Sequence, residues 1–151
     1  MGARHRGRER AVQALYEWAV TGRRLDTTFE RFWRVRDESD DVRRFAERLV
    51  RGVADSAEHI DRLIDHQAVN WRLDRFSNVD RSILRIAIWE MLNEPDTPSA
   101  VVIDEAIELG KKFSGPAAGP FINGILDGVR KRLAEEPATA EMEHTNEAGD
   151  G

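Results

Sequence analysis

Four arginines occupy alternate positions close to the N-terminus, and this cluster is the strongest indication of binding chemistry in the chain. They are Arg4, Arg6, Arg8 and Arg10, with a single acid, Glu9, beside them. Like charges at this density repel one another and are most favourable against a polyanion. The cluster therefore has two interpretations: a nucleic-acid-binding arm, or a solvated basic terminus.

Catalytic and metal-binding patterns are weak by comparison. His59 and His66 are seven residues apart, about 10 Å along a helix axis, which is too far for a shared metal ion. Asp55 lies one helical turn before His59, but no third ligand accompanies them. The stretch 110–112, Gly-Lys-Lys, lacks the earlier glycine and the Ser or Thr of a phosphate-binding loop. We therefore expect no enzyme, no bound metal and no cofactor.

The chain as a whole is acidic, and the excess lies at its C-terminal end. The sequence has 23 Lys and Arg against 28 Asp and Glu. Residues 134–151 hold six of those acids and no Lys or Arg, which leaves 22 acids against 23 cations elsewhere. This segment is also poor in large apolar residues, so burial cannot offset the entropy cost of ordering it. We expect a disordered acidic tail over 134–151 and one near-neutral domain over 1–133.

Other features of the composition narrow the class of protein. No apolar run approaches the ~20 residues of a membrane span, and the N-terminus lacks the apolar region of a signal peptide. Cysteine is absent, which excludes disulfides and thiolate metal sites. These features predict a cytoplasmic protein with no membrane partner.

The spacing of apolar residues is helical almost throughout, and no alternating strand pattern is evident. The sequence therefore predicts an all-α fold, built as two small helical bundles packed together. In the first helix, an early start would turn Arg4 and Arg8 toward the core beside Leu15. We therefore expect this helix to begin near Arg8, with Gly7 releasing residues 1–7 as an arm.

Caps and breakers mark the remaining helices. Gly22 ends the first helix, and Ser77 or Asn78 caps a central helix whose apolar residues nearly encircle its axis. The expected elements are a second helix carrying Phe29, Phe32 and Trp33, a third from Asp40 or Asp41 that ends near Gly52, and further helices over 56–67, 79–92, 99–113 and 121–133.

Four segments keep the order and spacing of a known family. They read Ala-Val-Gln-Ala-Leu-Tyr-Glu-Trp at 11–18, Val-Asp-Arg-Ser-Ile-Leu-Arg-Ile-Ala-Ile-Trp-Glu at 79–90, Val-Ile-Asp-Glu-Ala-Ile-Glu-Leu-Gly-Lys-Lys-Phe at 102–113 and Phe-Ile-Asn-Gly-Ile-Leu-Asp at 121–127. Behind an arginine-rich N-terminus, these segments resemble the bacterial NusB transcription-antitermination family. The resemblance covers about residues 4–133.

The resemblance implies a non-enzymatic protein of two three-helix subdomains. Such proteins bind the boxA element of leader RNA, particularly in ribosomal RNA operons, together with NusE, which is also a small-subunit ribosomal protein. They join RNA polymerase in an antitermination complex, and some form homodimers. One departure is the stretch 114–120, Ser-Gly-Pro-Ala-Ala-Gly-Pro, where the family usually carries acidic and polar residues.

Several side chains are candidates for RNA contact, most of them with a structural alternative. Tyr16 is either a stacking residue or a core tyrosine, and the lysines near residue 112 either extend an RNA track or complement a helix dipole. Phe121 is either a core or an RNA residue, and Asn123 is suited to reading a base edge. The full set of RNA candidates is Arg4, Arg6, Arg8, Tyr16, Lys111, Lys112, Phe121 and Asn123.

Charged residues on the central helix form a second set. Arg81 and Arg85 lie among apolar surface and need partners, either within the chain or across a protein interface. By resemblance, the NusE-facing surface surrounds this helix. The candidates are Asp80, Arg85 and Glu90, and self-association through the same helix would give a homodimer.

Two other functions remain open. A NusB-like domain also stands at the N-terminus of some ribosomal RNA cytosine methyltransferases, so the chain could be an RNA-binding module related to that domain. The other alternative is a helical oligomerisation module whose basic arm is only a solubilising terminus.

Overall fold

The computed structural model describes residues 2–69, 71 and 77–135. These residues form only helices and turns, with no β-strand among them, which confirms the predicted all-α class. The expected acidic tail lies outside the described residues from position 136 on, while Ala134 and Glu135 belong to the last helix. The helices are α1 Ala3–Thr21, α2 Leu25–Arg34, α3 Asp40–Ala68, α4 Asn78–Asn93, α5 Ser99–Phe113 and α6 Ala118–Glu135.

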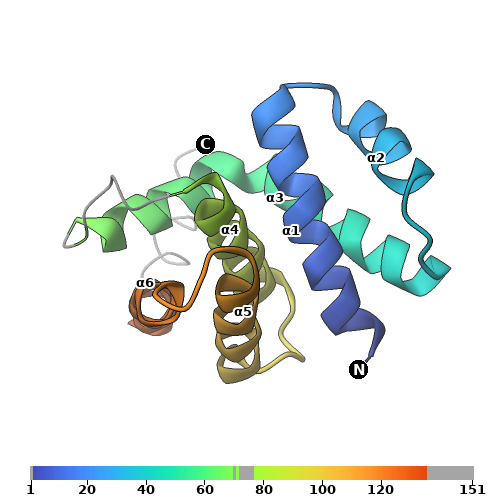
Figure 1. The fold of residues 1–151 in the computed structure, drawn as a ribbon. Coiled ribbons are helices and arrows are strands. Elements are labelled where there is room, and N and C mark those ends of the chain that lie inside the picture. The colour runs from blue at the N-terminus through green and yellow to red at the C-terminus, as the bar shows by residue number, and fades with distance from the viewer. Residues whose placement is uncertain (1, 70, 72–76, 136–151) are drawn as a thin grey trace, which may run out of the picture.

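The helices form two groups that share α3. On one side α1 packs against α2 and α3; on the other, α4, α5 and α6 pack against one another. The long α3 crosses behind α1 and also contacts α4 and α6 (Figure 1). A single apolar core runs through both groups, with Leu15, Leu49, Ile64, Leu84 and Ile125 all fully buried.

Local signals fix several helix ends where the sequence predicted them. Gly22 adopts a left-handed conformation with φ of +67°, and its N–H donates to the carbonyl of Trp18, so it ends α1 as expected. Ser77 caps α4, and its hydroxyl accepts from the N–H of Asp80 while the Asp80 carboxylate accepts in return from the N–H of Ser77. This capping box confirms one of the two predicted caps.

The predicted break near Gly52 is wrong, because α3 continues through it to Ala68. A Cβ on Gly52 would lie only 2.1 Å from the Trp89 ring of α4. The glycine therefore serves the close approach of two helices and does not end one.

The predicted start of α1 near Arg8 is also wrong. The helix begins at Ala3, so Arg4 and Arg6 belong to its first two turns and not to a free arm. Gly7 is buried, and a Cβ there would lie 2.7 Å from Phe45 of α3. Like Gly52, Gly7 lets two helices approach, and the N-terminal cations are thereby held on a rigid element.

The last helix begins at Ala118, three residues before the predicted start at Phe121. Pro120 falls within its first turn, where a proline costs no intrahelical hydrogen bond. Within the described part of the chain, no helix combines the length and apolarity needed to cross a membrane.

Candidate nucleic-acid interface

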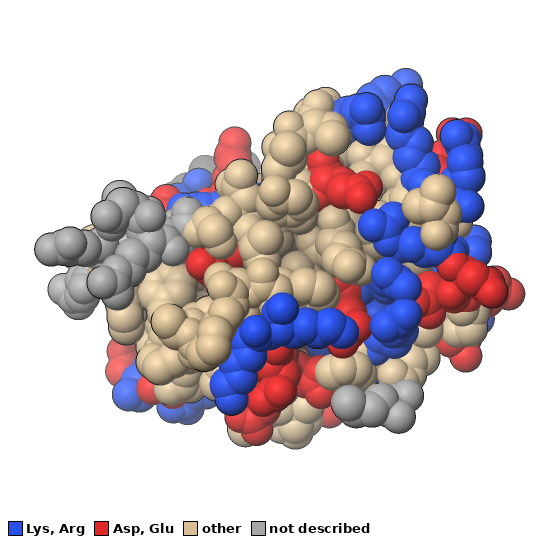
Figure 2. All heavy atoms as spheres, viewed as in Figure 1, with Lys and Arg blue, Asp and Glu red and all other residues tan. Residues whose placement is uncertain are grey.

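Cations from two helices meet on one face of the molecule. The beginning of α1 supplies Arg4, Arg6 and Arg10, and the end of α5 supplies Lys111 and Lys112; these five residues are called the basic face below. Lys and Arg side chains lie over α1, α2 and the end of α5 on this face, with acidic side chains among them (Figure 2). Helix–helix packing thus brings together two groups of cations that are about a hundred residues apart in the sequence.

Two carboxylates within the basic face hold most of its cations. Glu9 lies 2.9 Å from the Lys112 ammonium and 3.3 Å from Arg6, and Glu38 lies 2.7 Å from both Arg6 and Arg10. Burial is the largest single influence on Glu9 and would raise its pKa, but the hydrogen bond to Lys112 and the positive charges of Lys112, His5 and Arg6 together outweigh it, so the net pKa is lowered. For Glu38 burial is also the largest single influence, and the hydrogen bonds and charges of Arg10 and Arg6 together outweigh it and lower its pKa. Both groups are therefore ionised at neutral pH.

Arg8 turns inward, away from the basic face. Its guanidinium donates two bonds to the Glu90 carboxylate, at 2.9 and 2.8 Å, and the exposed fractions of the two side chains are only 6% and 1%. Arg8 was expected to contact RNA and Glu90 a protein partner, yet the structure places both in the interior. The reason is helical phase, since Arg8 lies on the α1 stripe that faces the core.

A shallow apolar hollow of about 270 Å³ lies next to the basic face. Tyr16, a residue 38% exposed, borders it, and Phe113 follows Lys112 directly in α5. The hollow thus places aromatic surface beside positive charge, the combination that proteins binding single-stranded RNA use. Its lining residues are Val12, Gln13, Tyr16, Glu17, Arg36, Val79 and Phe113.

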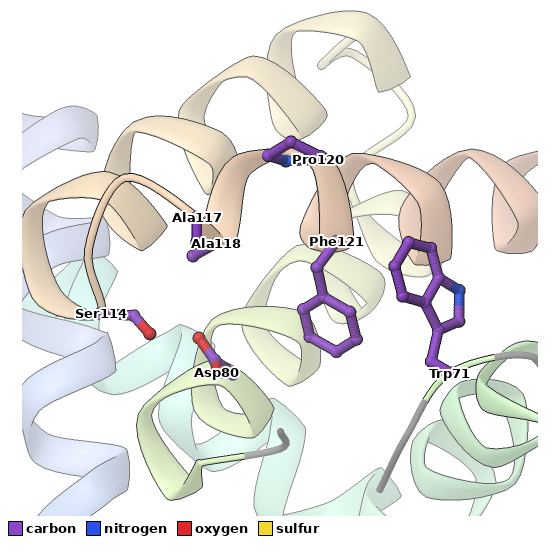
Figure 3. A pocket seen from close by; sticks show the side chains of 7 residues that line it. All are labelled: Trp71, Asp80, Ser114, Ala117, Ala118, Pro120 and Phe121. Atoms are coloured by element: carbon purple, nitrogen blue, oxygen red, sulfur yellow. The ribbon is translucent and has the colours of Figure 1, made fainter. Parts of the chain in front are cut away.

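A second hollow of about 280 Å³ adjoins the first. Its lining residues Asp80 and Ser114 directly follow Val79 and Phe113, which line the first hollow. Trp71 and Phe121 meet there edge to face, with ring centroids 5.2 Å apart. The Asp80 side chain points from α4 toward the start of α6 (Figure 3). Asp80 is buried, and its Oδ1 has no hydrogen-bond partner among the described residues. Asp80 was expected at a protein interface; the structure places it in the capping box of α4 and in the lining of this hollow.

The remaining predicted residues lie elsewhere. Asn123 is exposed, but it lines a different hollow, between α5 and α6, with Ser99 and Asp127. Arg85 donates two bonds of 2.8 Å to Asp61 of α3, so at least part of its pairing is internal. Among the described residues, no group of three His, Asp or Glu side chains is placed to hold a metal ion.

The sequence interpretation missed three contributors to this surface: Trp71, Glu9 as an organising acid, and Glu38. Trp71 carried one usable signal, an aromatic residue in a polar stretch between two helices. The carboxylates carried none, because Glu9 and Glu38 acquire their role only when α1, α5 and the residues before α3 come together.

Comparisons with known proteins identify the family and the fold. Residues 5–131 match the model of the NusB family. The transcription antitermination protein NusB of Myxococcus xanthus is 44% identical over 137 residues, covering 88% of this chain and 98% of that protein. NusB of T. maritima matches with 35% identity and a TM-score of 0.74, covering 85% of this chain and 90% of that one. A crystal structure of the antitermination factors NusB and NusE in complex with double-stranded RNA matches with 26% identity and a TM-score of 0.77, covering 87% of this chain and 98% of the matched one.

Proposed function

Since this chain belongs to the NusB family of transcription antitermination proteins, we propose that it binds boxA-type leader RNA of ribosomal RNA operons together with NusE. Members of the family are antitermination factors and not enzymes. In this proposal the protein acts in the cytoplasm, within an antitermination complex that contains RNA polymerase. The relative solved with NusE and RNA supports both partners.

The observation that carries the proposal is the continuity of charge and aromatic surface. The exposed cations Lys111 and Lys112 lie in the last turn of α5, and the next two residues, Phe113 and Ser114, line the two adjoining hollows. An RNA backbone on the basic face would place its bases beside Tyr16 and the Trp71–Phe121 pair. Phosphate contacts of this kind supply affinity, and splayed bases supply sequence preference.

Within this site Asp80 is suited to recognising a base. Its carboxylate lines the hollow beside Ser114, and as a hydrogen-bond acceptor it would favour a base edge that presents an amino or imino N–H. Tyr16 would stack a second base from the edge of the neighbouring hollow. Asn123, on another side of α6, would reach only RNA that continues around that helix.

For the protein partner we propose the α4 surface around Arg85. Glu90 is buried beneath it and would act only indirectly, by holding Arg8 and the start of α1. Arg85 keeps some exposed surface beside Asp61, which is a common arrangement at protein interfaces.

A salt-dependent titration tests the RNA proposal. Binding of a single-stranded boxA-type RNA, the same sequence as a duplex, and a scrambled RNA would be measured by fluorescence anisotropy with and without NusE. We expect the boxA-type RNA to bind more tightly than the scrambled one, and NusE to increase the difference. Equal binding of both RNAs in the presence and absence of NusE would exclude the proposed function.

A triple substitution locates the RNA on the basic face. Changing Arg4, Lys111 and Lys112 to Gln should weaken binding and flatten the salt slope by about two, since each phosphate contact contributes about 0.7. Binding to NusE should survive. The matched control changes three exposed cations on α3 and α6, Arg44, Arg62 and Lys131, to Gln; an equal loss in this control would show that only overall charge matters.

A further inference from the structure

The cations of the basic face are anchored from beneath by acids. The side chains of Glu9 and Glu38 are each only 9% exposed, while Arg6 and Lys112 remain 47% and 53% exposed. Each carboxylate engages more than one cation: Glu9 contacts Arg6 and Lys112, and Glu38 contacts Arg6 and Arg10. The anchors are buried, and of the cations that they hold Arg6 and Lys112 face outward, while Arg10 is only 16% exposed.

The anchors also connect three separate segments of the chain. Glu9 joins α1 to the end of α5 through Lys112, and Glu38 joins α1 to the residues that precede α3. Arg6 contacts both acids and so links the two sets of contacts. The spacing of the outward-facing cations is therefore set by the packing of the helices and not by free side-chain rotation.

This arrangement has opposite effects on two kinds of RNA binding. Long side chains that are already held lose less conformational freedom when they bind, which favours a ligand whose phosphates match their positions. The same carboxylates offset positive charge, which weakens the attraction of any polyanion regardless of sequence. The arrangement therefore strengthens the binding of RNA whose phosphates match the cations and weakens the binding of other RNA.

We propose that Glu9 and Glu38 are specificity-determining positioning residues of the RNA site, which hold Arg6, Arg10 and Lys112 in place and suppress binding to RNA of unmatched sequence. This inference rests on the proposed function, because it concerns discrimination between two RNAs at the same surface. Neither acid contacts RNA in this scheme; each acts through the cations that it holds.

The proposal is tested by substitutions that change either the charge or the length of an anchor side chain, but not both. Glu9→Gln removes the charge, and Glu9→Asp keeps the charge but shortens the side chain by one methylene. The matched control is Glu30→Gln, which removes an exposed acid paired with Arg34 on α2. Each variant would be titrated, with NusE present, against the boxA-type RNA and a scrambled RNA of equal length, and its thermal stability would be recorded.

We expect Glu9→Gln to bind the scrambled RNA more tightly and to lose about fivefold in discrimination, the scale of one ion pair. Glu9→Asp should lose similar discrimination without gaining affinity for the scrambled RNA, because its charge is intact. Glu30→Gln should discriminate as the unmodified protein does. If Glu9→Gln does not fold, Glu38→Gln provides the same test from the other anchor.

Three results would overturn the inference. Discrimination unchanged in the variants of both anchors would exclude a role in specificity. If the substitutions increased the affinity for both RNAs equally, the acids would act only by neutralising charge. Normal discrimination by Glu9→Asp would lead to the same conclusion. Failure of the unmodified protein to prefer the boxA-type RNA is a separate outcome, which refutes the proposed function itself.

Discussion

The Arg8–Glu90 pair shows how a charged residue in a basic cluster comes to serve the interior. Its neighbours Arg4 and Arg6 are exposed, but Arg8 lies one helical turn before Ala11 on the core-facing side. A guanidinium in that position requires a carboxylate with matching geometry, and Glu90 accepts from it in bidentate fashion. The pair joins α1 to α4 and fixes the helix that carries the basic face.

Breaking this pair should be costly. Arg8→Met leaves the Glu90 carboxylate buried without its main partner, and we expect a loss of about 3–5 kcal/mol in the free energy of unfolding, measured by urea denaturation. The double variant Arg8→Met with Glu90→Met should recover most of that loss, because no uncompensated charge remains. A single variant as stable as the unmodified protein would show that the pair is not a structural contact in solution.

The candidate site was predictable in its charges but not in its pairings. The excess of arginine at the N-terminus is visible in the sequence, and so are Lys111 and Lys112 at the end of a helix. The partners of these residues are not visible, because Glu9 meets Lys112 across 103 positions of sequence. Local sequence contains nothing about a contact that forms only when distant helices pack.

At the scale of helices, the same distinction explains which boundaries were predictable. The cap at Ser77 and the end at Gly22 depend on residues within one turn, and both predictions were confirmed. The predicted breaks at Gly7 and Gly52 were wrong, since each glycine faces a ring from a remote helix. The sequence alone does not distinguish a glycine that ends a helix from a glycine that allows another helix to pack closely.

Two glycine-to-alanine substitutions should therefore have different effects on the stability of the fold. At Gly52 an added methyl meets the Trp89 ring at 2.1 Å, and overpacking of this kind costs about 1–3 kcal/mol. At Gly119 in α6 the nearest atom would be 3.5 Å away, an ordinary contact, so alanine should be neutral or stabilise by about 0.5–1 kcal/mol. Melting temperatures of both variants check the pair, and a stabilised Gly52→Ala would contradict the assigned role.

For the molecule as a whole, the anchors of the basic face imply sensitivity to acid. The pKa values of Glu9 and Glu38 lie below the ordinary value of 4.5. Such carboxylates stabilise the fold fully above pH 4.5, and this stabilisation is lost as the pH falls through their lowered values. Since both acids join α1 to other segments, their protonation should loosen the whole fold.

We accordingly expect the melting temperature to fall steadily as the pH is lowered from about 5 to 3, the range below the ordinary carboxyl pKa. In the double variant Glu9→Gln with Glu38→Gln this dependence should be weaker, because neither side chain titrates. Parallel curves for the two proteins, followed by circular dichroism, would show that other carboxylates control the acid transition.

The length of α3 has a consequence for how the chain folds while it is being synthesised. The helix has 29 residues, about 43 Å at 1.5 Å per residue, and its second half buries Ile60, Leu63 and Ile64. The helices α4 and α6 that pack against α3 are encoded after it. During translation this apolar stripe therefore leaves the ribosome before the helices that pack against α3, and that packing is complete only after α6, the last described helix, has emerged.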